Sequence, residues 1–310
     1  MEVLFVGLGS IGTRHLNNLW QLAKEKGIEL QADALRSGGR PLPQATSEKL
    51  RAQATRLDGL AAHYDLAFIT NPTHLHADTL AGLRGRADAF FIEKPIFEST
   101  GYRLDDLGLG AGQKAYVAAP MRWCGVMLAL KKLLPGLAPY SARVICSSYL
   151  PGWRPGVDYR TVYSAHKDMG GGVTIDLIHE WDYLVDLFGT PLECYNLKGT
   201  YSSLEIDSDD LSVYIARYPS LLAEVHLDYF GRTYRRSIEL FCEDGTVVAD
   251  FGAGTLTLAD GTVQHWEEPV NERYLREMDY FIEYALHGGG ESVNPPRTAL
   301  DVLKLTLGEQ

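Results

Sequence analysis

The chain opens with Met1-Glu-Val-Leu-Phe-Val-Gly-Leu-Gly-Ser-Ile-Gly12, and this stretch decides the fold. The apolar run at residues 3–6 is typical of a buried strand in a parallel sheet. It leads directly into the glycine turn at residues 7–12. The apolar positions that follow recur at helical spacing: Leu16, Leu19, Trp20 and Ala23. A strand, a GxGxxG turn and a helix in this order indicate a dinucleotide-binding unit; the alternative is a glycine-rich turn in an ordinary βα connection.

Each part of this turn has a physical role in a dinucleotide-binding unit. Gly7 permits the tight turn, Gly9 lets the backbone approach a pyrophosphate, and Gly12 lets helix and strand pack closely. The helix that begins near Ser10 and Ile11 offers free N–H groups and the positive end of its dipole to the phosphates. We therefore predict that these residues bind the cofactor.

The composition is that of an ordinary globular chain of about two domains, since 310 residues exceed one average domain. The 40 acidic and 29 basic side chains give a net charge of −11, which argues against a nucleic-acid or anionic-membrane partner. No stretch reaches the ~18 apolar residues of a membrane span. Because there is no basic leader and the four cysteines are scattered, we expect a cytoplasmic protein. No metal-ligand spacing occurs in the sequence.

Strand and helix patterns alternate over residues 1–120, which predicts an N-terminal Rossmann domain with a doubly wound parallel sheet. A turn at Gly38-Gly39-Arg40-Pro41 follows the second strand, and a helix is expected at residues 76–83. Further strands are expected at residues 28–35, 66–70, 89–92 and 115–118.

Residues 121–310 form a second predicted domain, of α+β class, with a large, mostly antiparallel open sheet. Helices are expected at residues 126–134, 173–188 and 273–287, and the last helix, at 297–307, packs either within this domain or back on the Rossmann domain. The strand patterns run without helices between them. They cover residues 143–149, 192–201, 210–218, 221–229, 235–241 and 246–250. Asp260-Gly261 adds a hairpin signal.

The segment Ile92-Glu93-Lys94-Pro95 lies where a predicted parallel strand ends. Ligands bind at this edge of doubly wound sheets. A lysine placed there can hydrogen-bond a substrate hydroxyl and take part in proton transfer. The alternative is a surface lysine beside a turn proline.

Helix 173–188 carries a second group of candidate residues. Offsets of three and four residues bring Asp176, His179 and Glu180 near one face of the predicted helix. A carboxylate beside a histidine can orient it and assist proton transfer. The apolar neighbours indicate a mostly buried helix, where charges need a partner; a solvated ion pair is the alternative.

The loop at residues 153–164 combines aromatic rings, arginines and hydroxyls, including Trp153, Arg160 and Tyr163. Such side chains suit a sugar ring or a phosphate. A surface or interface loop is the alternative.

With these residues in place, the sequence resembles the Gfo/Idh/MocA oxidoreductases. The opening glycine motif, the Thr70–His76 segment, Glu93-Lys94-Pro95 and the helix at residues 170–189 are similar to motifs of that family, and Arg122-Trp123 resembles the pair that opens its second domain. The resemblance implies NAD(P)-dependent hydride transfer to or from a ring hydroxyl or carbonyl of a sugar or nucleotide sugar. It also implies homo-oligomers formed through the C-terminal sheet, and it is nearest to a bacterial subgroup associated with surface sugars.

The resemblance also assigns roles to residues. Lys94 corresponds to the catalytic lysine and Asp176 to the helix carboxylate. The family places a histidine where this chain has Glu180, so the proton-transfer group is either His179 or Glu180. Substrate contacts are expected from Arg122, Trp153, Arg160 and Tyr163. Cofactor contacts are expected from Gly7, Gly9, Ser10, Ile11, Gly12, Arg36, Ser37, Thr70, Asn71, Pro72, His76, Glu93 and Lys94.

The end of the second strand bears on the choice of cofactor. An acidic residue there would bind the ribose of NAD, but this chain has Arg36-Ser37, and Asp33 lies in mid-strand. An Arg-Ser pair suits a 2′-phosphate, so we predict NADP(H) in preference to NAD(H). Two other functions stay open: a non-catalytic dinucleotide-binding regulator of the same fold, and a reductase of a non-sugar substrate such as a tetrapyrrole.

Overall fold

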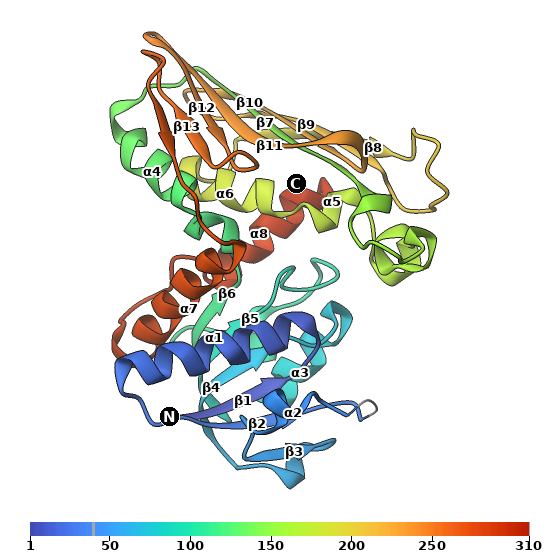
Figure 1. Cartoon of the computed structure of the whole chain (residues 1–310), viewed down its shortest axis with the longest axis vertical. Helices are drawn as coiled ribbons and strands as arrows, with labels where there is room; N and C mark the ends of the chain where they lie inside the picture. Colours follow the sequence, from blue (N-terminus) through green and yellow to red (C-terminus); the bar gives the residue numbers. More distant parts are fainter. Residues whose placement is uncertain (39–40, 310) are drawn as a thin grey trace. The chain divides into compact units, whose positions relative to one another are not determined.

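The computed structural model describes residues 1–38 and 41–309, so part of the turn predicted at residues 38–41 lies outside the described residues. These residues form two compact units. The first consists of Met1–Pro120 and Asn271–Leu300, and the second of Met121–Val270 with the segment from Asp301 onward. Figure 1 shows the elements of each unit.

Within the described residues, the first unit contains a six-stranded parallel sheet of order β3-β2-β1-β4-β5-β6. Its strands are β1 (Glu2–Val6), β2 (Gln31–Leu35), β3 (Ala52–Ala54), β4 (Tyr64–Ile69), β5 (Ala87–Ile92) and β6 (Lys114–Val117). Its helices are α1 (Ser10–Lys26), α2 (Gln44–Ser47), α3 (His76–Gly82) and most of α7 (Val270–His287). This order is that of a Rossmann sheet, which confirms the predicted doubly wound fold.

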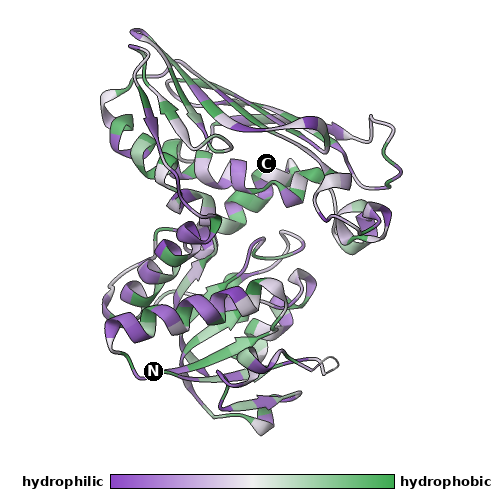
Figure 2. Cartoon of the chain, in the orientation of Figure 1, coloured by the Kyte–Doolittle hydropathy of each residue, from purple (hydrophilic) through white to green (hydrophobic). Residues whose placement is uncertain are grey.

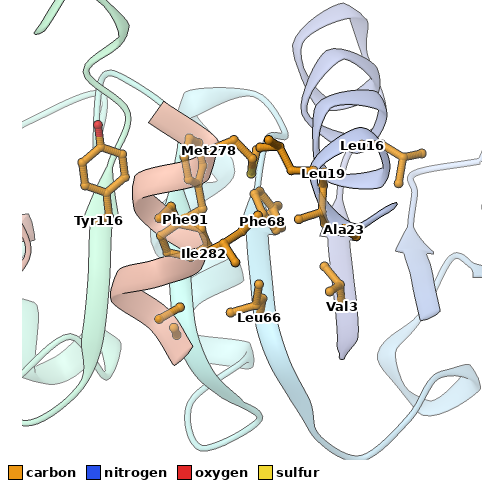
Figure 3. Close-up of a cluster of buried hydrophobic side chains, with 14 of the residues drawn as sticks. Val3, Leu16, Leu19, Ala23, Leu66, Phe68, Phe91, Tyr116, Met278 and Ile282 are labelled. Carbon is orange, nitrogen blue, oxygen red and sulfur yellow. The ribbon is translucent and has the colours of Figure 1, made fainter. Parts of the chain in front are cut away.

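Aromatic side chains of neighbouring strands form the core of this unit. Phe5 of β1 stacks on Phe68 of β4 with ring centroids 4.5 Å apart, and Phe68 stacks on Phe91 of β5 at 5.2 Å. Phe281 of α7 meets the last two rings edge-on. Figure 3 shows Met278 of the same helix beside this cluster. In Figure 2 the central strands β1, β4 and β5 are correspondingly mostly green. This packing fixes the strand ends that carry the candidate site.

In the part of the chain that the structure describes, the second unit contains an eight-stranded sheet of order β14-β13-β12-β11-β7-β10-β9-β8. Its strands are β7 (Ser141–Tyr149), β8 (Glu193–Gly199), β9 (Leu211–Arg217), β10 (Leu222–Asp228), β11 (Phe230–Cys242), β12 (Gly245–Asp250), β13 (Thr255–Thr257) and β14 (Val263–His265). Strands β7 and β10 pair in parallel, and the other described pairs are antiparallel. The predicted, mostly antiparallel open sheet is therefore confirmed, and so is the hairpin at Asp260-Gly261, which joins β13 to β14.

The helices of the second unit are α4 (Gly125–Leu133), α5 (Val173–Asp176), α6 (His179–Phe188) and α8 (Pro296–Leu307), the last of which begins in residues of the first unit. The single helix predicted at residues 173–188 is wrong, because α5 ends before α6 begins. Backbone bonds at the junction tighten to a three-residue spacing, from Ile178 to Ile175 and from Glu180 to Leu177. The helical-face argument that grouped Asp176 with His179 therefore does not hold.

A smaller difference concerns the start of β11. Strand β11 begins at Phe230, earlier than predicted, because its pairing with β7 continues past an irregularity between Phe230 and Arg235. Among the residues that the structure describes, no helix is both long and apolar enough to cross a bilayer.

Candidate active site

The glycine turn between β1 and α1 is shaped by close backbone packing. Gly7 has a positive φ of 87°, and a Cβ on it would lie 2.8 Å from the Cα of Asn71. A Cβ on Gly12 would lie 2.5 Å from the carbonyl oxygen of Gly7 and 2.7 Å from Oγ1 of Thr70. These positions therefore need glycine to let the turn and the helix pack against the end of β4.

Gly9 differs from its two neighbours. A Cβ on Gly9 would meet no atom of the described residues within 4 Å, and its φ of −73° is open to any residue. Packing thus gives no reason for a glycine here. Gly9 and Ser10 are exposed, and this feature is what a close approach of a ligand to the backbone requires.

The N-terminus of α1 adds an electrostatic attraction for an anion. The helix runs from Ser10 to Lys26, and Gly9 precedes it with no side-chain cap among the described residues. Its first turn contains no acidic residue. The N–H groups of the first turn and the helix dipole are therefore directed at whatever lies beside Gly9. The residues present fit a dinucleotide pyrophosphate.

The Thr70–His76 segment supports this turn from the neighbouring strand. Thr70 Oγ1 donates to the carbonyl oxygen of Gly7 at 2.6 Å, and Asn71 Nδ2 donates to Thr79 at 2.9 Å. His76 is buried, with its ring nitrogens 3.0 Å from the carbonyl oxygens of Asn71 and Ile96. Burial lowers the pKa of His76 despite these bonds. The contact of His76 with the cofactor stays a prediction; in the structure its ring supports the backbone of Asn71.

Lys94 follows β5, the strand next to β4. Its side chain is half-buried, and its ammonium group has no hydrogen-bond acceptor among the residues that the structure describes. Its backbone N–H donates to Oε2 of Glu93 at 3.1 Å, while Oε1 of Glu93 lies 2.6 Å from Nε2 of His15. Glu93 is therefore occupied by neighbouring protein groups, whereas Lys94 keeps its ammonium group for a ligand.

The end of β2 borders a pocket of about 450 Å³, and this pocket includes Arg36, Gln53 and Arg56. Arg36 Nη1 donates to Gln53 at 3.1 Å, and Ser37 is exposed. Asp33 is buried in β2 instead of facing the pocket. Its carboxylate binds the guanidinium of Arg51 through bonds of 3.0 and 2.6 Å and accepts a bond from Tyr64. Asp33 is thus unable to serve as the ribose-binding acid.

In the second unit, Asp176 lies between two tyrosines. The hydroxyl of Tyr163 donates to Oδ1 at 2.6 Å, and that of Tyr229 donates to Oδ2 at 2.5 Å. Burial, together with the charge of Asp176, raises the pKa of both tyrosines. Trp153 packs edge-on against the Tyr229 ring at 5.2 Å. Tyr163 and Trp153 stay partly exposed, so these two rings can meet a ligand, whereas Tyr229 is buried behind them.

Glu180 and His179 lie in different environments, although they are neighbours in sequence. Glu180 is fully buried, and both of its oxygens bind Arg236, at 2.7 and 2.9 Å. Burial alone would lower the pKa of Arg236, but the charge of Glu180 raises it well above its usual value. His179 is half-buried. Glu180 is therefore committed to a structural ion pair, which leaves His179 as the better candidate for proton transfer.

Arg122 and Arg160, which were predicted to contact the substrate, form ion pairs with carboxylates of the chain. Arg122 is buried and binds Asp182 through bonds of 2.9 and 2.7 Å, with Asp186 at 3.2 Å. These bonds join Arg122, at the start of the second unit, to α6, and its predicted contact with substrate stays a prediction. Arg160 is exposed and pairs with Asp158 and Glu205, so its contact with substrate stays a prediction.

The functional partners that sequence reasoning missed are His15, Tyr229 and Arg236. Each meets a residue at least 53 positions away in the chain, so spacing alone gave no signal. His15 was the easiest of the three to find from the sequence, because it follows Gly12 by three residues on the buried face of α1.

No family model matches the sequence, and no curated protein matches it. Solved structures match the whole fold. A levoglucosan dehydrogenase, solved with NADH and levoglucosan, matches with a TM-score of 0.79 and 15% identity, covering 100% of this chain and 98% of that chain. The biliverdin reductase of Synechocystis, solved with biliverdin and NADP⁺, also gives 0.79 at 15% identity, over 99% and 97% of the two chains. The chain has the fold of these oxidoreductases.

A third match, the WlbA dehydrogenase of Bordetella pertussis with NADH and UDP-GlcNAcA, gives a TM-score of 0.75 and 20% identity, over 99% of this chain and 94% of that chain. The fold implied by the resemblance to Gfo/Idh/MocA oxidoreductases is thereby confirmed. At these identities the likeness establishes the fold, and function depends on the site itself.

Proposed function

We propose that this chain is an NAD(P)-dependent oxidoreductase that transfers a hydride between the nicotinamide and a ring hydroxyl or carbonyl of a sugar-type substrate. One observation carries the proposal. The turn between β1 and α1 is tightly packed at Gly7 and Gly12 yet open at Gly9, beside the uncapped N-terminus of a 17-residue helix. An ordinary βα turn needs no such opening, whereas a pyrophosphate does.

The residues of the chain bind the cofactor and manage protons, and the bound nicotinamide supplies hydride transfer. Gly9, Ser10 and Ile11 would hold the pyrophosphate through their backbone N–H groups. Lys94, whose ammonium group has no acceptor among the described side chains, would polarise the reacting oxygen. In the second unit, His179 would be the proton-transfer group, since a neutral imidazole accepts a proton near pH 7.

We propose NADP(H) as the preferred cofactor. The acid that would select NAD is missing from the end of β2, because Asp33 is bound by Arg51 and Tyr64. Arg36 and Arg56 line the pocket there, and an arginine fork suits a 2′-phosphate. Asp58 shares this pocket and pairs with Arg56, and Arg36, next to the end of β2, is the arginine chosen for the test of this preference.

A sugar ring or a nucleotide sugar is the proposed substrate class. The cluster of Trp153, Tyr163 and Asp176 offers an aromatic surface beside hydroxyl and carboxylate groups, which is the usual chemistry of sugar recognition. The second candidate is a reductase of a non-sugar ring system, because a biliverdin reductase shares the fold as closely as the sugar dehydrogenases do.

Two further proposals concern assembly. The strands β8 and β9 expose apolar side chains on one side of the second sheet, among them Tyr195, Leu197 and Ile215, which supports a homo-oligomer formed through this sheet. The net charge of −11 supports a small-molecule partner instead of a nucleic acid. Light scattering of the purified protein, with Leu197→Glu as the comparison, tests the oligomer.

The decisive experiment has two stages. Fluorescence titration with NADPH and NADH first measures binding. The absorbance of the reduced nicotinamide is then followed with sugars, nucleotide sugars and biliverdin as substrates. Turnover with a sugar-type compound supports the leading proposal, and turnover with biliverdin alone supports the second candidate. Tight cofactor binding with no turnover in the whole panel would favour a non-catalytic regulator.

A further inference from the structure

A buried histidine and the glutamate beside Lys94 form an ionisable pair in the first unit. The side chain of His15 is 0% exposed, and its Nε2 lies 2.6 Å from Oε1 of Glu93. The other oxygen of Glu93 accepts the backbone N–H of Lys94 at 3.1 Å. The backbone of Glu93 is itself held by Ile69 of β4. One carboxylate therefore connects the cofactor-side helix α1 to the lysine at the end of β5.

The surroundings of His15 determine which of its nitrogens carries the proton. Its ring packs 4.7 Å from Phe91 and 6.1 Å from Tyr274, measured between centroids. Its Nδ1 is buried and has no hydrogen-bond partner among the described residues. A proton on Nδ1 would have no acceptor there, so the geometry fits a neutral imidazole that donates from Nε2 to an ionised Glu93.

We propose that His15 is a positioning residue, which keeps Glu93 ionised and fixed so that a permanent negative charge lies beside Lys94. This inference rests on the proposed function, in which Lys94 polarises the reacting oxygen. It goes further by adding a residue of α1 that touches neither the substrate nor the reacting atoms.

The groups that face Glu93 agree with an ionised carboxylate. Burial opposes ionisation, but the hydrogen bond from His15 and the charge of Lys94 bring the pKa of Glu93 below its usual value. On α3, burial lowers the pKa of His76, so this histidine is neutral. On α7, burial raises the pKa of Tyr274, with Glu93 adding to the effect, so it is also neutral. His15 and Lys94 are therefore the groups that hold the charge on Glu93.

The sign of the pH effect follows from this balance. Glu93 is ionised above its lowered pKa and loses its charge as the pH falls through that value. Without the bond from His15, burial dominates and protonation begins at a higher pH. The acid limb of the pH profile of kcat should therefore move to higher pH in His15→Leu.

The test compares His15→Leu with His15→Gln, whose amide can donate the same bond, and with Leu19→Ala, which loosens the core around α1 but keeps both members of the pair. We expect His15→Leu to lower kcat at least tenfold, to leave the KM for NADPH within about twofold, and to move the acid limb upward by about one pH unit. His15→Gln should keep most of the wild-type kcat and most of the wild-type position of the acid limb. An unmoved acid limb in His15→Leu, or an equal shift in Leu19→Ala, would overturn the proposal.

A second measurement needs no turnover. In the wild-type protein labelled with ¹⁵N-histidine, NMR should show His15 protonated at Nε2 and bare at Nδ1 across neutral pH, with the signal assigned by its loss in His15→Gln. An imidazolium, or a proton on Nδ1, would overturn the inference. If the proposed function is wrong, the wild type shows no turnover but keeps this tautomer. The failure of the proposed function is therefore distinguishable from the failure of the His15 inference.

Discussion

Gly9→Ala separates the role of the glycine turn in ligand binding from its role in folding. Gly9 has an extended backbone, with φ −73° and ψ −162°, and a Cβ there would meet no described atom within 4 Å. Removing a flexible glycine favours the folded state by about 0.4–1 kcal/mol, and an alanine is a poorer helix N-cap by a similar amount. The free energy of unfolding should therefore change by less than about 1 kcal/mol.

Gly12→Ala is the matched variant, only three residues away. Its Cβ would lie 2.5 Å from the carbonyl oxygen of Gly7, so either the turn or the helix must move. Overpacking of this kind costs about 1–3 kcal/mol. For a unit of this size, that loss lowers the melting temperature by roughly 2–12 °C.

The two variants should affect different properties: Gly9→Ala should chiefly weaken cofactor binding, whereas Gly12→Ala should chiefly lower the stability of the fold. In Gly9→Ala the methyl group occupies the space through which the pyrophosphate approaches the backbone. Loss of a single hydrogen bond to a charged group is worth about 1.5–3 kcal/mol, which predicts NADPH binding weakened by at least tenfold.

Calorimetry and fluorescence titration of the two variants and the wild type measure both quantities. An unchanged melting temperature with weakened NADPH binding in Gly9→Ala supports the site. If Gly9→Ala binds NADPH as tightly as the wild type does, the pyrophosphate does not lie on this turn, and the reasoning fails whatever the result for Gly12→Ala.

Three further predictions concern single side chains. Lys94→Met should lower kcat by at least 10²-fold and leave NADPH affinity within about twofold; more than a tenth of wild-type kcat in steady-state assays would exclude the proposed role. Arg36→Ala should weaken NADPH binding at least tenfold and leave NADH binding unchanged in fluorescence titrations; wild-type binding of NADH tighter than that of NADPH would refute the preference. His179→Ala should lower kcat by about 10²-fold without unfolding the protein, whereas Glu180→Gln should chiefly lower stability, by about 3–5 kcal/mol, because Arg236 loses its buried partner. Near-normal kcat in His179→Ala would return the assignment to Glu180.

The Rossmann unit was predictable because its signals are local. A continuous apolar run predicts a buried parallel strand wherever it occurs, and β1, β4, β5 and β6 all coincide with such runs. Gly7 and Gly12 are informative for the same reason, since a backbone that approaches within 3 Å of its neighbour admits no side chain. Sequence spacing therefore located the turn. The structure adds that packing requires glycine at Gly7 and Gly12 but not at Gly9.

The contacts between charged residues could not be predicted, because they join distant parts of the chain. Glu180 meets Arg236 across 56 residues, and Glu93 meets His15 across 78. Helical periodicity predicted one face for residues 176–180, but the hydrogen bonds tighten at Ile178 and break that face. A periodicity argument assumes a regular helix, and it fails where the backbone bonds tighten to a three-residue spacing.

The pairings of the acidic residues around α6 limit which of these residues can take a proton from the substrate. Asp176 accepts bonds from two tyrosines, Glu180 is paired with Arg236, and Asp182 is paired with Arg122. For Asp182, burial raises the pKa even against the charge of Arg122, as expected of a carboxylate far from solvent. A proton acceptor for substrate must reach a ligand and change its charge near neutral pH at low cost. Glu180 and Asp182 are too buried for the first requirement, and each is held by an arginine. His179 is half-buried beside them, and the proposed proton transfer therefore assigns the role to this histidine, which is displaced by one residue relative to the Gfo/Idh/MocA pattern.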